Sequence, residues 1–192
     1  MSLEKQIEEL QRIVQVLQND KNIQARVTTV GAFATLAEYK TRIFTEGKAS
    51  SGAKIGSYDT SPFYASSESL RGLPKGKFNK KGKTGKSKFK SGKSHKSTYL
   101  KSGYKEFRSK AGRQNSKVDL NLTGASQQTI QVGTKGDQTV IGFTDPKRMV
   151  ILEAKERKYG KDIFTLSQQE QAVYQETVDR EIQQVIKEIV NR

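Results

Sequence analysis

Residues 71–110 read RGLPKGKFNKKGKTGKSKFKSGKSHKSTYLKSGYKEFRSK, and this stretch divides the chain into three parts. It holds 15 lysines and arginines and one acid, Glu106, so its net charge is +14 of the +15 carried by the whole chain. The segments on either side, 1–70 and 111–192, are each close to neutral. The basic character therefore belongs to one internal segment, and the two flanking segments must build the fold that holds it.

Apolar side chains are sparse within residues 71–98, where Leu73, Phe78 and Phe89 stand among Lys, Gly and Ser. A segment of this composition buries too little apolar surface to offset the entropy lost when its backbone is ordered. We therefore predict a flexible basic loop over 71–98 that supplies no core element. A short helix with an aromatic face is expected to follow. Its residues are Tyr99, Leu100, Tyr104, Phe107 and Ala111.

The lysines of the predicted loop are candidate contacts to an anionic partner. Lysine outnumbers arginine here, which favours point-charge contact over the bidentate reading of bases. Three interpretations stay open: a nucleic acid, an acidic protein surface in an assembly, and a solvated loop. Tyr99, Tyr104 and Phe107 are expected either to stack on bases or to pack internally. The candidate contact residues are Lys75, Lys77, Lys80, Lys81, Lys83, Lys86, Lys88, Lys90, Lys93 and Lys96.

On the N-terminal side of the loop, the chain begins with a predicted helix over 2–19. Its apolar residues recur at spacings of four, three, four and three, which places them on one stripe. Two interpretations are open: the stripe packs on its own domain, or it is a seam of two heptads that docks on another subunit. Residues 1–20 are thus a candidate docking arm. The docking residues are Leu3, Ile7, Leu10, Val14 and Leu17.

A second helix is predicted over 23–45, with Gly47 as its C-terminal cap. The Gly- and Ser-rich residues 47–58 are expected to form a loop, and 57–64 an extended segment. Beyond the basic stretch, alternation of apolar and polar residues predicts a strand over 118–122.

A β-hairpin is predicted from strands 129–134 and 138–143 around Lys135-Gly136-Asp137. The pattern leaves the register open, because Ile141 and Phe143 alternate in the opposite phase to Val140. The expected buried face consists of Ile130, Val132, Val140 and Phe143.

Two helices are predicted to close the chain. Thr144 or Asp145 caps a helix over 146–158 that ends at Gly160. Ser167 and Glu170 form a capping box before a helix over 168–190. Its apolar stripe is Val173, Thr177, Ile182, Val185, Ile186 and Ile189. The chain is therefore predicted to be a single α+β domain over 1–192. A small antiparallel sheet, made of a hairpin and one or two further strands, packs with long N-terminal and C-terminal helices. The long basic loop is inserted into this domain.

Enzyme chemistry is not expected, and we predict neither a catalytic residue, nor a metal site, nor a cofactor. His95 is the one histidine and there is no cysteine, so metal sites built from His and Cys are excluded. The GK[ST] endings at Gly82 and Gly85 lack the earlier glycine of a phosphate-binding loop, because residues 77 and 80 are lysines. No apolar run is long enough to span a membrane, and the acidic start does not resemble a signal peptide, so synthesis in a cytoplasm is expected.

The region after the basic stretch resembles a recurrent pattern of tailed phages. Residues 120–125 read LNLTGA, 128–132 read QTIQV and 139–143 read TVIGF, and a Tyr-Gly segment, KYGKDIF, follows at 158–164. This series is similar to the Mu G-like virion morphogenesis and tail-completion (neck) proteins. A long helix ending in Arg42-Ile43-Phe44 before a Gly-rich loop also fits.

The resemblance implies a non-enzymatic virion component, often a ring of six or twelve subunits between the head connector and the tail. Its partners would be copies of itself and neighbouring portal, connector or tail proteins, with DNA in the channel as a further candidate and no membrane. The protein is then expected in the virion after synthesis in the host cytoplasm. The alternative hypothesis is a cellular, ribosome-associated type of nucleic-acid-binding protein whose Lys-rich extension folds on nucleic acid.

Overall fold

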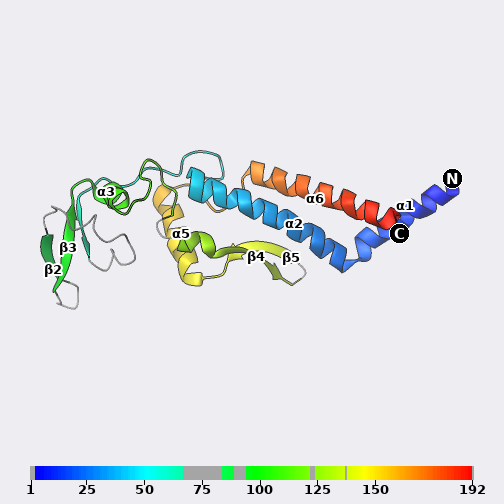
Figure 1. Cartoon of the computed structure of the whole chain (residues 1–192), viewed down its shortest axis with the longest axis horizontal. Coiled ribbons are helices and arrows are strands. Elements are labelled where there is room, and N and C mark those ends of the chain that lie inside the picture. Colours follow the sequence, from blue (N-terminus) through cyan, green and yellow to red (C-terminus); the bar gives the residue numbers. More distant parts are fainter. Residues whose placement is uncertain (1–2, 67–83, 89–93, 122–123, 137, 192) are drawn as a thin grey trace.

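The computed structural model describes residues 3–66, 84–88, 94–121, 124–136 and 138–191. The molecule is elongated: α1 lies at one end, a small sheet with α3 at the other, and α2 and α6 run side by side between them (Figure 1). In chain order the elements are α1 (Leu3–Asn19), α2 (Lys21–Lys40), η1 (Thr41–Glu46), β1 (Phe63–Ser66), β2 (Thr84–Lys88), β3 (Ser94–Leu100), α3 (Gly103–Lys110), α4 (Ala125–Gln128), β4 (Ile130–Lys135), β5 (Gln138–Phe143), α5 (Pro146–Tyr159) and α6 (Gln168–Val190). The predicted α+β class is confirmed.

The helix boundaries follow local capping signals. Asp20 accepts hydrogen bonds from the backbone N–H groups of Asn22 and Ile23 at the start of α2. Asp145 does the same for α5, which ends at the left-handed Gly160. At α6 the capping box predicted from Ser167 and Glu170 is present in both directions. These short-range patterns were sufficient to predict the starts of α5 and α6.

The second predicted helix changes character before its end. After Lys40 the backbone widens into the π-helical turn η1, which stops at Gly47 with a φ of 68°. The three consecutive residues Arg42, Ile43 and Phe44 of this turn are all buried. Gly47 is the predicted cap, and a side chain there would meet the carbonyl oxygen of Val118.

The predicted hairpin is confirmed, and the pairing of its two strands shows which side chains face the core. β4 and β5 are antiparallel, with Ile130 opposite Phe143 and Val132 opposite Ile141. These four side chains face the main core. Val140 was predicted to share that face, and this is wrong, because it pairs with Gly133 at the alternate position of the pleat.

The strand predicted over 118–122 is not formed by its described part, residues 118–121. Val118 and Asp119 are both buried, so the alternation of the sequence does not correspond to one buried and one exposed face. Leu120 adopts a positive φ of 50°, which a strand does not allow. The hydrogen bonds of the Asp119 carboxylate, described below, explain why this segment turns instead of extending.

A second sheet has the order β1-β3-β2 and is antiparallel throughout. β2 and the first five residues of β3 lie within residues 71–98, where the sequence predicted no regular element, and Ser97 and Thr98 are buried. The prediction that this stretch supplies no core is therefore wrong for its last residues. The extended segment expected at 57–64 becomes strand only from Phe63, where β1 begins. The further strands thus form a sheet of their own rather than extending the hairpin.

Three clusters of buried apolar side chains stabilise the molecule. The largest joins α2 and η1 to the hairpin and to the segment around Ile163. A small cluster packs α3 against β1 and β3 through Phe107 and Leu100. The third lies where α1, α2 and α6 meet. Between the first and third clusters, α2 and α6 approach closely at Gly31, where a Cβ atom would lie 2.8 Å from the Tyr174 ring and from Val178.

Candidate assembly surfaces

The predicted docking stripe on α1 is exposed. The exposed fractions are 72% for Leu3, 47% for Ile7, 62% for Leu10 and 48% for Val14. Leu17, the fifth residue of the stripe, is half-buried against the cluster where α1 meets α2 and α6. Of the two open interpretations, packing of the whole stripe on its own domain is wrong for the described residues. The sequence reasoning missed Ile13, which lies outside the stripe and is the residue that α1 buries.

α1 is nevertheless fixed in place at its base. Ile13 packs with Val27, Val185 and Ile189, and a guanidinium N–H of Arg12 donates to the carbonyl oxygen of Ile189 at 3.1 Å. The side-chain amide of Gln24 donates to the last carbonyl groups of α1. α1 is therefore held in a defined direction, and it extends beyond the end of α6 (Figure 1).

A second exposed apolar run lies on α5. Met149, Val150 and Ile151 have exposed fractions of 42%, 59% and 46%. These residues were not predicted from the sequence to form a surface. The signal was available in part: three consecutive apolar residues cannot all face one side of a helix, so at least one of them had to be exposed.

The predicted basic contact residues lie mostly outside the described residues, which exclude Lys75, Lys77, Lys80, Lys81, Lys83, Lys90 and Lys93. Of the remaining three, Lys86 and Lys88 belong to β2 and Lys96 belongs to β3. The strand register aligns Lys86 with Lys96. The structure thus brings two of the predicted lysines to directly opposite positions of one strand pair.

The aromatic residues near the basic segment serve packing where the structure describes them. Phe107 is buried, and its ring stacks on Tyr104 at a centroid distance of 5.5 Å. Tyr99 lies on β3 and its ring contacts Tyr64 at 5.0 Å. The predicted short helix therefore begins at Gly103, after Tyr99 and Leu100 have joined the sheet. Phe107 has no exposed face to offer a base.

A buried ion pair between Arg108 and Asp119 attaches α3 to the main core. Arg108 donates through one guanidinium nitrogen to both carboxylate oxygens of Asp119, at 2.8 and 3.1 Å. The Tyr58 hydroxyl donates to the same carboxylate at 2.8 Å, and the Arg108 guanidinium lies 4.5 Å from the centre of the Tyr58 ring. Burial raises the pKa of Tyr58 above its usual range, so its hydroxyl stays protonated as a donor. Neither charge is left for an external ligand.

A second buried pair, Arg42 and Glu170, joins η1 to the start of α6. Arg42 Nε lies 2.6 Å from Glu170 Oε1, and the other guanidinium nitrogens donate to the carbonyl oxygens of Lys48, Ile163 and Thr165. A depression of about 650 Å³ lies beside this pair. Because Arg42 and Glu170 are saturated by each other and by backbone groups, the depression offers no free buried charge, and we assign both pairs to structural support.

The described residues contain no metal-binding cluster of His, Asp and Glu, and none of their helices is long and apolar enough to cross a membrane. His95 lies on β3, within the basic segment 71–110. Comparison with protein-family models, with curated proteins and with solved structures gave no match. The likeness to phage neck proteins therefore stays a prediction based on sequence patterns.

Proposed function

We propose that this chain is a structural virion protein of a tailed phage, a subunit of a head–tail connector, neck or tail-completion ring. It acts by self-assembly and by docking on neighbouring portal, connector or tail proteins. It performs no catalysis and needs no cofactor. The proposal rests on the resemblance of residues 120–164 to the phage pattern and on one structural observation, the exposed stripe of α1.

That stripe supports an assembly role because its exposure is costly in an isolated subunit. Burying a large aliphatic side chain is worth about 1.5–3 kcal/mol, and α1 leaves four such side chains about half exposed or more. A helix that is held at its base and apolar along its outer stripe is suited to binding a protein surface. Exposed apolar residues on α5 give the subunit a second such surface.

The basic segment fits the same proposal. Residues 71–110 carry a net charge of +14, and the elements of this segment that the structure describes, β2, β3 and α3, lie at the end of the molecule opposite α1 (Figure 1). In a ring, copies of this segment would point the same way and add their charges. The partner is then either DNA in the channel or an acidic surface of the adjoining ring.

The experiment is immunogold labelling of phage particles with an antibody to this chain, together with electron microscopy of the purified protein. We expect label at the vertex that joins head and tail, and closed rings in the purified sample. Absence from particles, together with a purified protein that forms no ring, would overturn the proposal.

The second candidate function, a cellular nucleic-acid-binding protein, is favoured by the concentration of charge in residues 71–110. It predicts tight binding of RNA or duplex DNA, with an affinity that falls steeply as salt is raised because phosphate counterions are released. Filter binding at several salt concentrations distinguishes the two candidates when it is read beside the particle labelling. Steep salt dependence in a protein that is absent from particles would favour this second function.

A further inference from the structure

The charges beside the exposed stripe of α1 indicate what kind of protein surface could bind it. The first half of α1 is acidic, because Glu4, Glu8 and Glu9 outnumber Lys5. A complementary surface must therefore be apolar in the middle and basic at its edges. Among the described residues, α2 and α5 both carry exposed apolar side chains that could meet that requirement.

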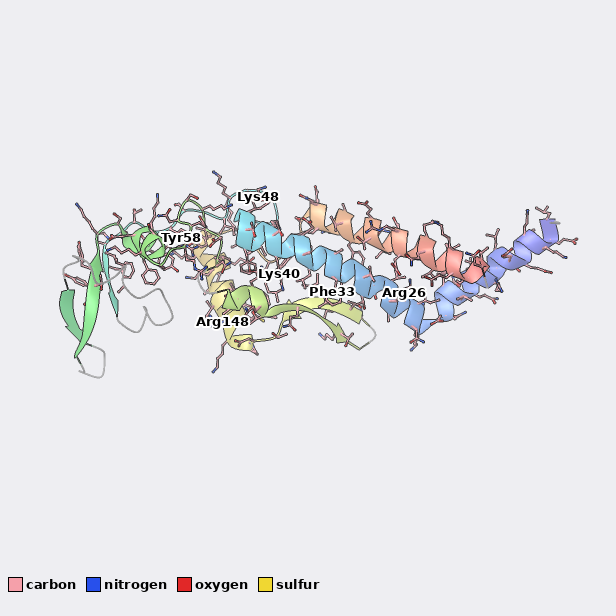
Figure 2. The ribbon with its side chains drawn as sticks, viewed as in Figure 1. Arg26, Phe33, Lys40, Lys48, Tyr58 and Arg148 are labelled. Atoms are coloured by element: carbon pink, nitrogen blue, oxygen red, sulfur yellow. The ribbon has the colours of Figure 1, made fainter. Side chains whose placement is uncertain are left out.

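The α2 surface does not meet it. Val30 and Phe33 are exposed there, and Figure 2 shows Phe33 on α2 together with Arg26. The Arg26 guanidinium lies 2.7 Å from the carboxylate of Glu181 and 2.9 Å from that of Glu188. The basic group beside this apolar surface is therefore already neutralised within the chain.

The α5 surface does meet it. Along one side of α5, Val150, Ile151 and Ala154 are exposed, with Lys147 at the beginning and Lys158 at the end of the same side. The helix as a whole carries five basic and two acidic residues. None of its lysines or arginines forms an ion pair within 4.0 Å among the described residues.

The lengths of the two surfaces also agree. The exposed stripe of α1, from Leu3 to Val14, spans about 17 Å at 1.5 Å per residue, and α5 spans about 20 Å. The two helices of one chain cannot meet, because α1 packs on the far ends of α2 and α6, while α5 lies beyond the hairpin (Figure 1). Any contact between them joins two copies.

We propose that α1 of one subunit docks on α5 of the next, with Leu3, Ile7, Leu10 and Val14 packed against Val150 and Ile151. The contact joins two different surfaces, so it is head-to-tail, and repetition of such a contact closes a ring when the rotation between copies permits. The closure of these contacts into a ring rests on the proposed function. The acidic and basic residues at the edges fix the register of the two helices.

The absence of cysteine from the chain makes the contact testable by disulfide trapping. The test protein carries Leu10→Cys and Ile151→Cys together; both sites are exposed, so the fold is expected to persist, which circular dichroism checks. The matched control carries Gln15→Cys with Ile151→Cys, because residue 15 is uncharged and exposed on α1 outside the stripe. After mild oxidation we expect a ladder of covalent dimers, trimers and higher species from the test protein and a much weaker one from the control.

The two single variants complete the test. Mixing Leu10→Cys protein with Ile151→Cys protein should give one covalent heterodimer, whereas Leu10→Cys alone should stay uncrosslinked. Efficient crosslinking of Leu10→Cys alone would show that α1 pairs with α1 of a second copy and would overturn the proposal. Rings without the α1–α5 crosslink would overturn this contact and leave the proposed function standing. The crosslink in a protein that is absent from particles would support the contact and contradict the proposed function.

Discussion

Arg42 and Glu170 form a buried ion pair, with 2.6 Å between Nε and Oε1, that joins the π-helical turn η1 to the first turn of α6. The same carboxylate accepts the backbone N–H of Ser167 as the second half of the capping box. One acidic side chain thus completes a local cap and a contact between segments 128 residues apart. The exposed stripe of α1 depends on this support, because α1 packs on α2 and α6.

Removing one partner of that pair should be strongly destabilising. Glu170→Ala leaves the Arg42 guanidinium buried without its counterion, which typically costs about 3–5 kcal/mol. Chemical denaturation of the purified variant measures the loss. The matched control is Glu188→Ala, which breaks the exposed pair with Arg26 and is expected to cost much less. Equal losses in the two variants would contradict the role given to Arg42 and Glu170.

The Asp119 carboxylate should matter more than the Tyr58 hydroxyl that donates to it. Asp119→Ala leaves the guanidinium of Arg108 unpaired, with an expected loss of about 3 kcal/mol or more. Tyr58→Phe keeps the ion pair and removes two hydrogen bonds, one donated to the carboxylate and one accepted from the backbone N–H of Asp119, with an expected loss of about 1–2 kcal/mol. Thermal unfolding of both variants checks the order, and the reverse order would contradict it.

Alkaline pH should reduce stability through the buried tyrosines. The Tyr39 hydroxyl donates to the carbonyl oxygen of Phe164, and burial raises the pKa of Tyr39 above its usual value. An unfolded tyrosine ionises near pH 10, so above about pH 10 the unfolded chain loses a proton that the folded chain retains, and the unfolding free energy falls. The contribution of this group is complete below that pH and is lost as pH rises further.

The variant Tyr39→Phe isolates this effect from the titration of the lysines. Near neutral pH the original protein should be more stable than the variant by about 1 kcal/mol, because of the hydrogen bond to Phe164. The difference should shrink as the pH is raised above about 10. Urea denaturation of both proteins at several pH values measures it. A difference that stays constant throughout would contradict the proposed cause.

Charge placed on the α1 stripe should prevent assembly without unfolding the subunit. Leu10 is 62% exposed, so Leu10→Lys is expected to change the unfolding free energy by less than about 0.5 kcal/mol. In sedimentation velocity the variant should shift from the oligomer to the monomer. Gln15→Lys adds the same charge at an exposed residue of α1 outside the stripe and should assemble normally. Loss of the oligomer in both variants would argue against a specific stripe.

Short-range signals predicted most of the helices. Asp145, Ser167 and Gly160 act within one turn of their helix ends, so their roles are readable from adjacent residues. The α1 stripe was also predicted, together with the possibility that it faces another subunit. Neighbouring residues do not reveal which face the rest of the chain covers, and so Ile13 was missed.

Long-range contacts explain the errors. Asp119 breaks the alternation of 118–122 because it pairs with Arg108 of α3 and with Tyr58, which lies 61 residues earlier in the chain. The phase of β5 depends on pairing with β4, which places Ile141 and not Val140 on the core side. The strands β2 and β3 arise in a sequence with few apolar residues, and β3 is held by backbone pairing with β1 and by the burial of Leu100. Composition alone cannot predict such pairing.

We propose that this chain assembles into a closed ring through head-to-tail contacts. Native mass spectrometry of the purified full chain over a range of concentrations measures the number of subunits. We expect one discrete closed oligomer of six or twelve subunits, which Leu10→Lys reduces to monomer. A chain that stays monomeric at every concentration, or that forms only symmetric dimers unaffected by Leu10→Lys, would contradict it.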